Sequence, residues 1–330
     1  MKKYLFVTLW IISVILILVF SQNVTEITYK TLTQTLTEVF PVLFPFSVIA
    51  SLMVSMGGGE TIGNILPISK IFLMPASASA PIICGALCGF PLGAKTACDM
   101  YEYGSFSKKC AEKVISVSNN TGPVFIISII GKKYFKSVEV GLVIYFSQFI
   151  AALISSLAIN GKINEESKYI TKNVSFCCAF SEAVKSALIS CLYVCGFISV
   201  FSSLLYAAHH LPKGLFGSFS ALLEFTSGAK YGGDSGGLSG MFVVAFSVGW
   251  SGLSVIMQTI TYTYPLGLSI RPLIKIKILS GLICGLICSI YFTPMKIHMI
   301  CALIVLILLL YMIRCKETIM HKITENSNCS

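Results

Sequence analysis

The chain has 330 residues, of which 55% are hydrophobic and only 12% are charged. Soluble domains carry about 25% charged residues, so this composition excludes a soluble enzyme with one membrane anchor, a disordered protein and a soluble nucleic-acid-binding protein. The apolar residues form long continuous runs, whereas an outer-membrane barrel needs short alternating segments. We therefore expect an all-α polytopic membrane protein with roughly eight spanning helices, each about 20 residues long.

The net charge is +10, and nearly all of the basic residues are lysines. Lysines that flank apolar runs are typical of membrane proteins, because cytoplasmic loops and anionic headgroups both favour them. The 13 cysteines lie mostly inside apolar runs and form no CxxC cluster with histidine, so we interpret them as small packing residues. We expect the lipid bilayer as a partner, and neither nucleic acid, cofactor nor metal.

The first apolar run, Tyr4 to Phe20, follows two lysines and lacks a small-x-small cleavage site. It predicts an uncleaved span with a cytoplasmic N-terminus. Next comes an amphipathic polar stretch, Val24 to Thr37. Glu38 to Ser55 then predicts a second span that Pro41 and Pro45 interrupt.

The segment from Pro67 to Lys95 is apolar but carries regularly spaced helix breakers. These residues are Pro75, Pro81, Pro91, Gly85, Gly89 and Gly93. Glycines four residues apart allow helix backbones to approach closely, and prolines this dense favour broken or re-entrant helices buried by protein.

Two lysine-rich turns enclose the next apolar run, Val114 to Ile130, which Ser118 to Pro123 interrupts. The turns contain Lys108, Lys109 and Lys113 on one side and Lys132, Lys133 and Lys136 on the other. If both turns are cytoplasmic, the run between them cannot cross the membrane once, and a re-entrant hairpin is predicted.

The rest of the chain reads as further spans separated by one polar loop. The predicted spans are Val138–Ile159, Ser186–Tyr206, Ile274–Phe292 and Ile297–Ile313, and Met241–Tyr264 crosses the membrane fully or halfway. We divide the chain into an N-terminal span (1–29), a first repeat (30–160), a polar loop (161–175), a second repeat (176–313) and a cytoplasmic tail (314–330).

The two repeats are suggested by weak internal similarity. Glu38 to Ser55 compares with Glu182 to Ser199, and Cys88 to Lys95 compares with Val248 to Val255. Interrupted helices at corresponding places in two halves indicate a transporter-like site near the membrane midplane. The relative direction of the halves is left open.

Charged residues inside apolar segments are functional candidates, because a charge in the bilayer is costly. Lys95 and Asp99 are i,i+4 partners on a helix. They either pair on a helix at the membrane boundary, or Asp99 holds Lys95 in a cavity where it can meet an anionic group.

Asn119 and Asn120 precede Gly122-Pro123, where a helix must break. Their amides either satisfy the freed backbone groups or present donors and acceptors to a ligand. Glu224, Ser254 and Gln258 likewise suit either a polar cavity or interhelical hydrogen bonds worth about 1 kcal/mol.

These arguments predict a substrate-binding set at the helix breaks, and they predict no catalytic residue. The set is Gly89, Pro91, Gly93, Lys95, Asp99, Asn119, Asn120, Gly122, Pro123, Glu224, Ser254 and Gln258. Hydrolase, metalloprotease and phosphate-binding motifs do not occur in the chain, so we do not expect an enzyme.

Four segments resemble one known family: Gly89–Lys95, Asp99–Gly104, Ser118–Ile126 and Gly252–Gln258. The chain is similar to the sporulation integral membrane protein YlbJ family, which is grouped with the Gate or nucleoside-recognition domain proteins. The resemblance implies two repeated halves of a Gate-type fold and a role in endospore formation, particularly in assembly of the spore cortex.

The combined expectation is a multi-pass cell-membrane permease that moves a small solute during sporulation. A non-transporting scaffold for sporulation machinery and a nucleoside or ion transporter unrelated to sporulation are the alternatives. A second copy of the chain, or other sporulation membrane proteins, are the protein partners left open.

Overall fold

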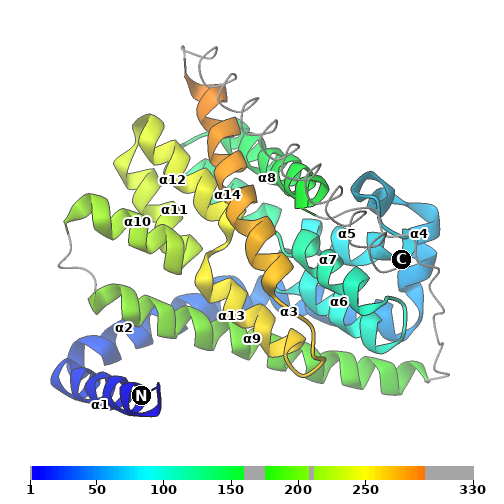
Figure 1. The fold of residues 1–330 in the computed structure, drawn as a ribbon, viewed down its shortest axis with the longest axis horizontal. Helices are drawn as coiled ribbons and strands as arrows, with labels where there is room; N and C mark the ends of the chain where they lie inside the picture. The colour runs from blue at the N-terminus through cyan, green and yellow to red at the C-terminus, as the bar shows by residue number, and fades with distance from the viewer. Residues whose placement is uncertain (1, 160–174, 208–211, 294–330) are drawn as a thin grey trace, which may run out of the picture.

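The computed structural model describes residues 2–159, 175–207 and 212–293. Most of the predicted polar loop, the predicted Ile297–Ile313 span and the cytoplasmic tail lie outside these ranges. Figure 1 shows that the described residues form helices joined by turns, with α14 crossing the middle of the bundle. The all-α prediction is confirmed for this part of the chain.

The helices of the first half begin with a helix at the N-terminus and end with a long apolar one. They are α1 (Lys2–Val19), α2 (Ser21–Gln34), η1 (Thr35–Val39), α3 (Phe40–Ser55), α4 (Gly58–Ile65), η2 (Ile68–Phe72), η3 (Ala76–Ala78), α5 (Ser79–Cys88), α6 (Leu92–Glu102), α7 (Lys108–Ser118), η4 (Val124–Tyr134) and α8 (Val138–Ile159).

The second half contains α9 (Phe176–Ala207), α10 (Lys213–Leu223), α11 (Phe225–Ser235), α12 (Gly237–Trp250), α13 (Gly252–Thr263) and α14 (Arg271–Phe292).

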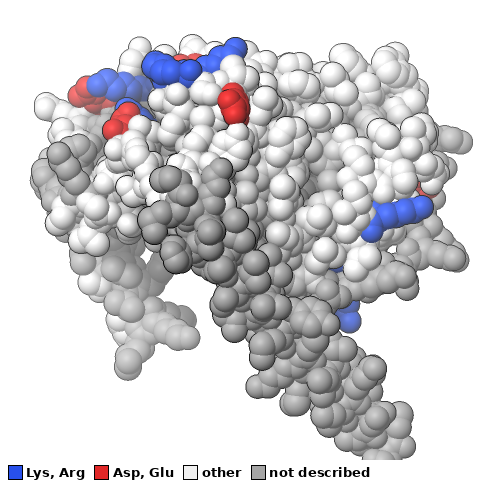
Figure 2. All heavy atoms as spheres, turned by 90° about the horizontal axis from the view of Figure 1, so that it is seen from above, with Lys and Arg blue, Asp and Glu red and all other residues white. Residues whose placement is uncertain are grey.

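Within the described ranges, five helical segments are long and apolar enough to cross a membrane. They are Ser21–Ser55, Val138–Ile159, Phe176–Tyr206, Gly237–Thr263 and Arg271–Phe292. Among the described residues visible in Figure 2, the charged side chains lie mainly along the upper edge and at the right of the face. The protein is therefore a multi-pass α-helical membrane protein, while the number eight stays a prediction.

The segment from Ser21 to Ser55 is one continuous helix, which corrects the predicted division into a polar stretch and a proline-interrupted span. Pro41 lies in the first turn of α3, and Pro45 is tolerated inside it. The wider π turn of η1 lies just before both prolines. π turns of this kind are often found at functional sites.

Helices α5 and α6 form a helical hairpin whose tip is Gly89-Phe90-Pro91. A Cβ atom added at Gly93 would lie 2.7 Å from the Cα of Gly85, so the two arms touch through glycines. Gly89 has φ +83°, a conformation that suits glycine at the turn. The broken helix predicted between Pro67 and Lys95 is confirmed.

Helices α10 and α11 form the second hairpin. A Cβ atom added at Gly228 would lie 2.5 Å from the Cα of Ala221, which places the two arms side by side. The helix is interrupted at Glu224, whose backbone is extended with φ −141° and ψ 117°. Each half of the described chain thus contains one hairpin.

Helix α7 runs alongside α14 in the same direction. Near the start of both helices, the backbone N–H of Ser269 donates to Glu112 Oε1 at 2.8 Å. Further along, Lys277 of α14 donates to Asn120 Oδ1 at 3.4 Å, just after α7 has ended. Later residues of one segment therefore contact later residues of the other, so α7 and α14 are parallel.

The η4 helix continues the same path to the far end of α14. A Cβ atom added at Gly131 would lie 3.0 Å from the Cα of Gly141, near the start of α8. Close by, Tyr291 near the end of α14 donates its hydroxyl to Glu139 Oε1 at 2.6 Å. Together α7 and η4 pass from one end of the bundle to the other.

This path corrects the re-entrant hairpin predicted for Val114 to Ile130. The prediction assumed that both lysine-rich turns lie at the same membrane surface. Lys113 instead is 1% exposed and donates to the backbone carbonyl of Phe72 at 2.9 Å, so it does not mark a surface. The segment breaks at Asn119–Pro123 and continues onward.

The corresponding broken helix of the second half, α12–α13, runs in the opposite direction. A Cβ atom added at Gly249 would lie 2.7 Å from the carbonyl oxygen of Ser280, and one added at Gly285 would lie 2.7 Å from Phe242. Residue numbers rise along α12 as they fall along α14, so the two helices are antiparallel.

The long helices of the two halves are antiparallel as well. Thr28 and Ser203 share a hydrogen bond, whereas Val48 packs with Ala183 and Ala187, so α2–α3 and α9 run in opposite directions. Figure 1 shows α3 and α9 lying together along the lower side of the bundle. The two halves are therefore inverted relative to each other.

The order of the helices also shows which segments of the two halves correspond, and it differs from the correspondence predicted from the sequence. The α5–α6 hairpin matches the α10–α11 hairpin, and the broken helix α7–η4 matches α12–α13. The predicted comparison of Cys88–Lys95 with Val248–Val255 paired a hairpin tip with a broken helix and is wrong. The Gate-type fold and the boundaries of the repeats stay predictions.

The crossing path of α7–η4 can be tested by labelling with a membrane-impermeant maleimide in a variant that lacks reactive native cysteines. We expect Lys109→Cys and Lys132→Cys, both at exposed positions, to react from opposite sides of the membrane. Reaction of both from the same side would restore the re-entrant hairpin.

The close contact of Gly93 with the end of α7 predicts a loss of stability on Gly93→Ala. The added Cβ would lie 2.1 Å from the carbonyl oxygen of Ser118, and overpacking of this kind costs about 1–3 kcal/mol. Thermal unfolding in detergent measures the effect. The matched control is Gly196→Ala on α9, where the Cβ meets nothing within 4 Å. Equal stability of the two variants would contradict the contact.

Candidate functional site

The four helix interruptions of the two halves meet in one region of the bundle. In the first half, a Cβ atom added at Gly89 would lie 2.7 Å from the backbone nitrogen of Gly122. In the second half, one added at Gly252 would lie 3.0 Å from the backbone nitrogen of Phe225. The two hairpin tips touch through Phe90 and Phe225, whose ring centroids are 4.8 Å apart in an edge-to-face arrangement.

Side chains satisfy the backbone of the break after α7. Gln148 of α8 accepts from the backbone N–H of Thr121 at 3.1 Å and donates to its carbonyl at 2.8 Å. The Thr121 hydroxyl donates to the carbonyl of Val248, near the end of α12, at 3.3 Å. Thr121 therefore ties together the broken helices of both halves.

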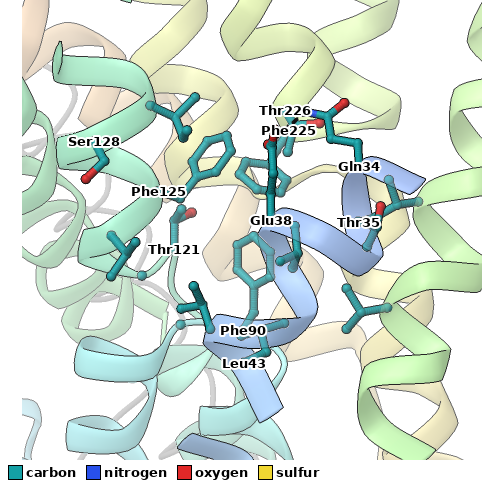
Figure 3. A pocket seen from close by; sticks show the side chains of 18 of the residues that line it. Gln34, Thr35, Glu38, Leu43, Phe90, Thr121, Phe125, Ser128, Phe225 and Thr226 are labelled. Carbon is teal, nitrogen blue, oxygen red and sulfur yellow. Dashed lines mark hydrogen bonds between the residues drawn. The ribbon is translucent and has the colours of Figure 1, made fainter. Parts of the chain in front are cut away.

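A cavity of about 390 Å³ lies beside three of the four breaks, namely both hairpin tips and the break between α7 and η4, and α13 contributes Gln258 to its lining. Figure 3 shows the rings of Phe90, Phe125 and Phe225 around it, with Glu38 facing it from η1. Phe125 and Phe225 are also in direct contact, with ring centroids 5.0 Å apart. The inner wall therefore combines aromatic faces with polar backbone.

The polar lining of the cavity divides into a buried part and an exposed part. Thr121 and Gln258 are buried at its inner wall. Glu38, Lys133 and Lys230 line it with exposed side chains. Lys133 lies in the last turn of η4, so the charged residues mark the end of the bundle where η4 finishes. The cavity thus has an uncharged inner wall and a charged outer edge.

Part of the predicted substrate-binding set lines this cavity. The lining residues from the set are Gly89, Gly122, Pro123 and Gln258. The other members do not line the cavity: Pro91, Gly93, Lys95, Asp99, Asn119, Asn120, Glu224 and Ser254. Their contacts show what each of them does in the structure.

Lys95 and Asp99 form an ion pair of 2.6 Å on α6. Lys95 also donates to the hydroxyl of Ser51 at 3.1 Å, which joins α6 to α3. The Lys95 side chain is 8% exposed and that of Asp99 is 26% exposed. The pair therefore sits at a partly buried helix junction away from the cavity.

The two asparagines have different surroundings. Asn120 Nδ2 donates to the carbonyl of Val117 at 2.7 Å, which satisfies the end of α7. Asn119 Nδ2 donates to the hydroxyl of Thr259 on α13 at 3.1 Å, so it joins the two halves. Its Oδ1 atom is buried without a hydrogen-bond partner in the part of the chain that the structure describes.

Glu224 is fully buried and caps the N-terminus of α11. Its Oε2 atom accepts from the Ser227 backbone N–H at 2.8 Å and from the Thr226 hydroxyl. An acid at this position also suits the positive end of the helix dipole. Gln258 donates to Ser254 Oγ at 3.4 Å on the same helix, and its Oε1 atom has no partner among the described residues.

Sequence reasoning missed most of the cavity lining. Phe90 and Thr121 lie inside two of the segments that resemble the known family. Each is next to a residue of the predicted substrate-binding set. Glu38 was noted only as the acid that leads a span. Phe125 lies inside the Ser118–Ile126 segment as well, but it is not in the predicted substrate-binding set. Phe225 has no signal of its own, because an isolated phenylalanine in an apolar run is typical of lipid contacts and helix packing.

Comparison with known proteins supports the resemblance drawn from the motifs. No protein-family model and no solved structure matches the chain. The sporulation integral membrane protein YlbJ of Bacillus subtilis (strain 168) is 23% identical in an alignment 304 residues long. The match covers 78% of this chain and 74% of that protein. The chain is thus similar to YlbJ over most of the length of both proteins, and the resemblance read from its motifs is confirmed.

Proposed function

We propose that this protein is a membrane permease that moves a small solute during endospore formation. The observation that carries the proposal is the meeting of four helix breaks, two from each inverted half, three of which line one cavity of about 390 Å³. Transporters commonly place their sites where interrupted helices of two repeats meet near the membrane midplane.

The lining of the cavity suits a solute with both apolar and polar groups. Phe90, Phe125 and Phe225 offer ring faces and edges for contact with an apolar or planar group. Gln258 Oε1 is a buried acceptor without a partner among the described residues, so a ligand donor at this position would satisfy it.

The link to sporulation rests on the relative's name. The similar protein is named a sporulation integral membrane protein, and we extend that process to this chain. Cortex assembly is the stage that we propose, and loss of the protein would then give spores with a defective cortex.

We also propose that the protein is not an enzyme. Among the described residues that line the cavity, Glu38 is the single acidic side chain and it lies at the exposed edge, and no histidine occurs. The buried hydroxyl of Thr121 therefore has no general base beside it, whereas nucleophilic catalysis needs one.

Filling the cavity tests the permease directly. Ser128 lines the cavity with an exposed side chain, so Ser128→Trp can place a large ring in the cavity while the fold is kept. We expect this variant to be made at the normal level in the membrane but to fail to restore heat resistance and cortex thickness to spores of a deletion strain.

The matched control is Ser218→Trp on α10, an exposed serine outside the cavity lining, which should restore normal spores. Normal spores with Ser128→Trp, combined with defective spores after Lys108→Glu and Lys109→Glu at the surface, would support the scaffold instead. Normal spores from the deletion strain itself would remove the link to sporulation.

A further inference from the structure

A second polar region lies where α3, α6, α9 and α13 meet, and its residues do not line the cavity. Lys95 of α6 pairs with Asp99 at 2.6 Å and donates to Ser51 Oγ of α3 at 3.1 Å. The hydroxyl of Tyr262 on α13 lies close to Ser190 of α9 and to Asp99. We call these five residues the polar junction.

Two oxygen atoms of the polar junction are not satisfied by helix packing. The hydroxyls of Ser190 and Tyr262 are buried and complete no hydrogen bond among the described residues. Buried polar atoms of this kind are rare in proteins unless they meet water or a ligand. Gln258, one turn before Tyr262 on α13, has such an atom at the inner wall of the cavity. The unsatisfied groups therefore continue along α13 from the cavity into the junction.

The elements that form the polar junction also line the cavity. In each of them, a cavity residue and a junction residue are about one helical turn apart along the chain. The pairs of cavity and junction residues are Phe46 and Ser51, Phe90 and Lys95, Val194 and Ser190, and Gln258 and Tyr262. Residue numbers rise from the cavity to the junction on α3, α6 and α13 and fall on α9, as the antiparallel packing of α3 and α9 requires. The junction therefore lies directly beyond the cavity.

The polar junction is directed toward the end of the bundle opposite to the charged outer edge of the cavity. That edge lies where η4 finishes. Helix α6 leads away from the hairpin tip and ends at Glu102, shortly before α7 begins at the other end of the bundle. Asp99 lies in the last turn of α6 with 26% of its side chain exposed. The cavity and the junction are thus directed to opposite ends of the bundle.

A cluster of buried apolar side chains from α3, α6 and α9 separates the cavity from the junction. Its members are Leu43, Leu92, Cys191 and Val194. Leu92 lies between Phe90 at the cavity and Lys95 in the junction, and Cys191 is next to Ser190. Figure 3 shows Leu43 close to Phe90 at the lower end of the cavity. Hydrophobic constrictions of this kind close membrane pathways by excluding water.

We propose that the polar junction is the second half of the solute path and that the apolar cluster is the closed gate between it and the cavity. The inference rests on the proposed permease and adds the residues through which the solute reaches the other side of the membrane. When the gate opens, Ser190 and Tyr262 meet water and solute, while the cavity closes at its charged edge. Alternating access of this kind is the general behaviour of transporters with repeated halves.

The test is the reaction of single cysteines with a small, membrane-impermeant methanethiosulfonate, added to each side of membrane vesicles in turn. The full chain is used, with its reactive native cysteines replaced. Ser128→Cys lies in the cavity, and Ser190→Cys lies in the junction, where Ser190 is 2% exposed. We expect the two variants to react from opposite sides. No reaction of Ser190→Cys from either side, or reaction from the side that labels Ser128→Cys, would overturn the proposal.

The matched control is Ser155→Cys, a fully buried serine of α8 whose hydroxyl contacts Ser280 of α14. It is outside the cavity and the junction, so we expect no reaction from either side. Labelling of Ser155→Cys as fast as Ser190→Cys would show general access of the reagent to buried positions and would overturn the path.

The gate itself is tested by Leu43→Asn in the Ser190→Cys background. Asparagine is close to leucine in size but attracts water, so Ser190→Cys should now react several-fold faster from the side that labels Ser128→Cys. Val194→Thr, which keeps the side-chain shape, replaces Leu43→Asn if that variant does not fold. The control is Leu36→Asn in η1, which is exposed and outside the cavity lining and should leave the labelling unchanged. An unchanged rate with the gate variant would overturn the gate.

The labelling result is separate from the spore assay, because it needs no known solute. Defective spores with Ser128→Trp, together with an unreactive Ser190→Cys, would overturn the gate and leave the permease in place. Normal spores with Ser128→Trp would remove the permease and the solute path with it.

Discussion

The fold depends on one constraint: a backbone that leaves the helical conformation inside a membrane must find partners for its peptide groups within the protein. The backbone leaves the helical conformation at two hairpin tips and in two broken helices. Gln148 supplies both hydrogen bonds that Thr121 needs, and Asn120 satisfies the end of α7. Because these partners come from neighbouring elements, the breaks are stable only when the elements are packed together.

Glycine contacts bring those partners close enough. The arms of the first hairpin touch each other and Ser118 through Gly85 and Gly93, and the second hairpin reaches α12 through Gly232 and Gly240. In a bilayer, helices gain little hydrophobic free energy from meeting, so close backbone contact supplies much of their association. The small residues therefore position the breaks, and the breaks in turn position the cavity.

The sequence predicted the interruptions better than their arrangement. Proline and glycine mark Gly89–Pro91 and Gly122-Pro123 directly, since these residue types constrain the backbone by themselves. The direction of the following segment depended on which membrane surface each lysine-rich turn faces. Lys109 and Lys132 are both exposed but lie at opposite ends of the α7–η4 path, and charge patterning alone cannot show this.

The cavity was still harder to predict, because its walls come from residues that are far apart in the chain. Glu38, Lys133 and Lys230 line the same space from three different elements. The local similarity between Cys88–Lys95 and Val248–Val255 was misleading for the same reason: a glycine-aromatic pair can mark a hairpin tip or a broken helix. Only the contacts between helices distinguish the two.

The inversion of the halves gives the proposed permease a physical basis for access from both sides. The tips of the two hairpins meet at Phe90 and Phe225. The cavity lies on the side of this contact that faces the charged residues of η4 and α11. Because the two halves run in opposite directions, each could adopt the packing that the other has now. The cavity would then open at the opposite end of the helix bundle. The contact between the two tips would then separate the alternating openings, and substitutions that loosen it should affect transport more than stability.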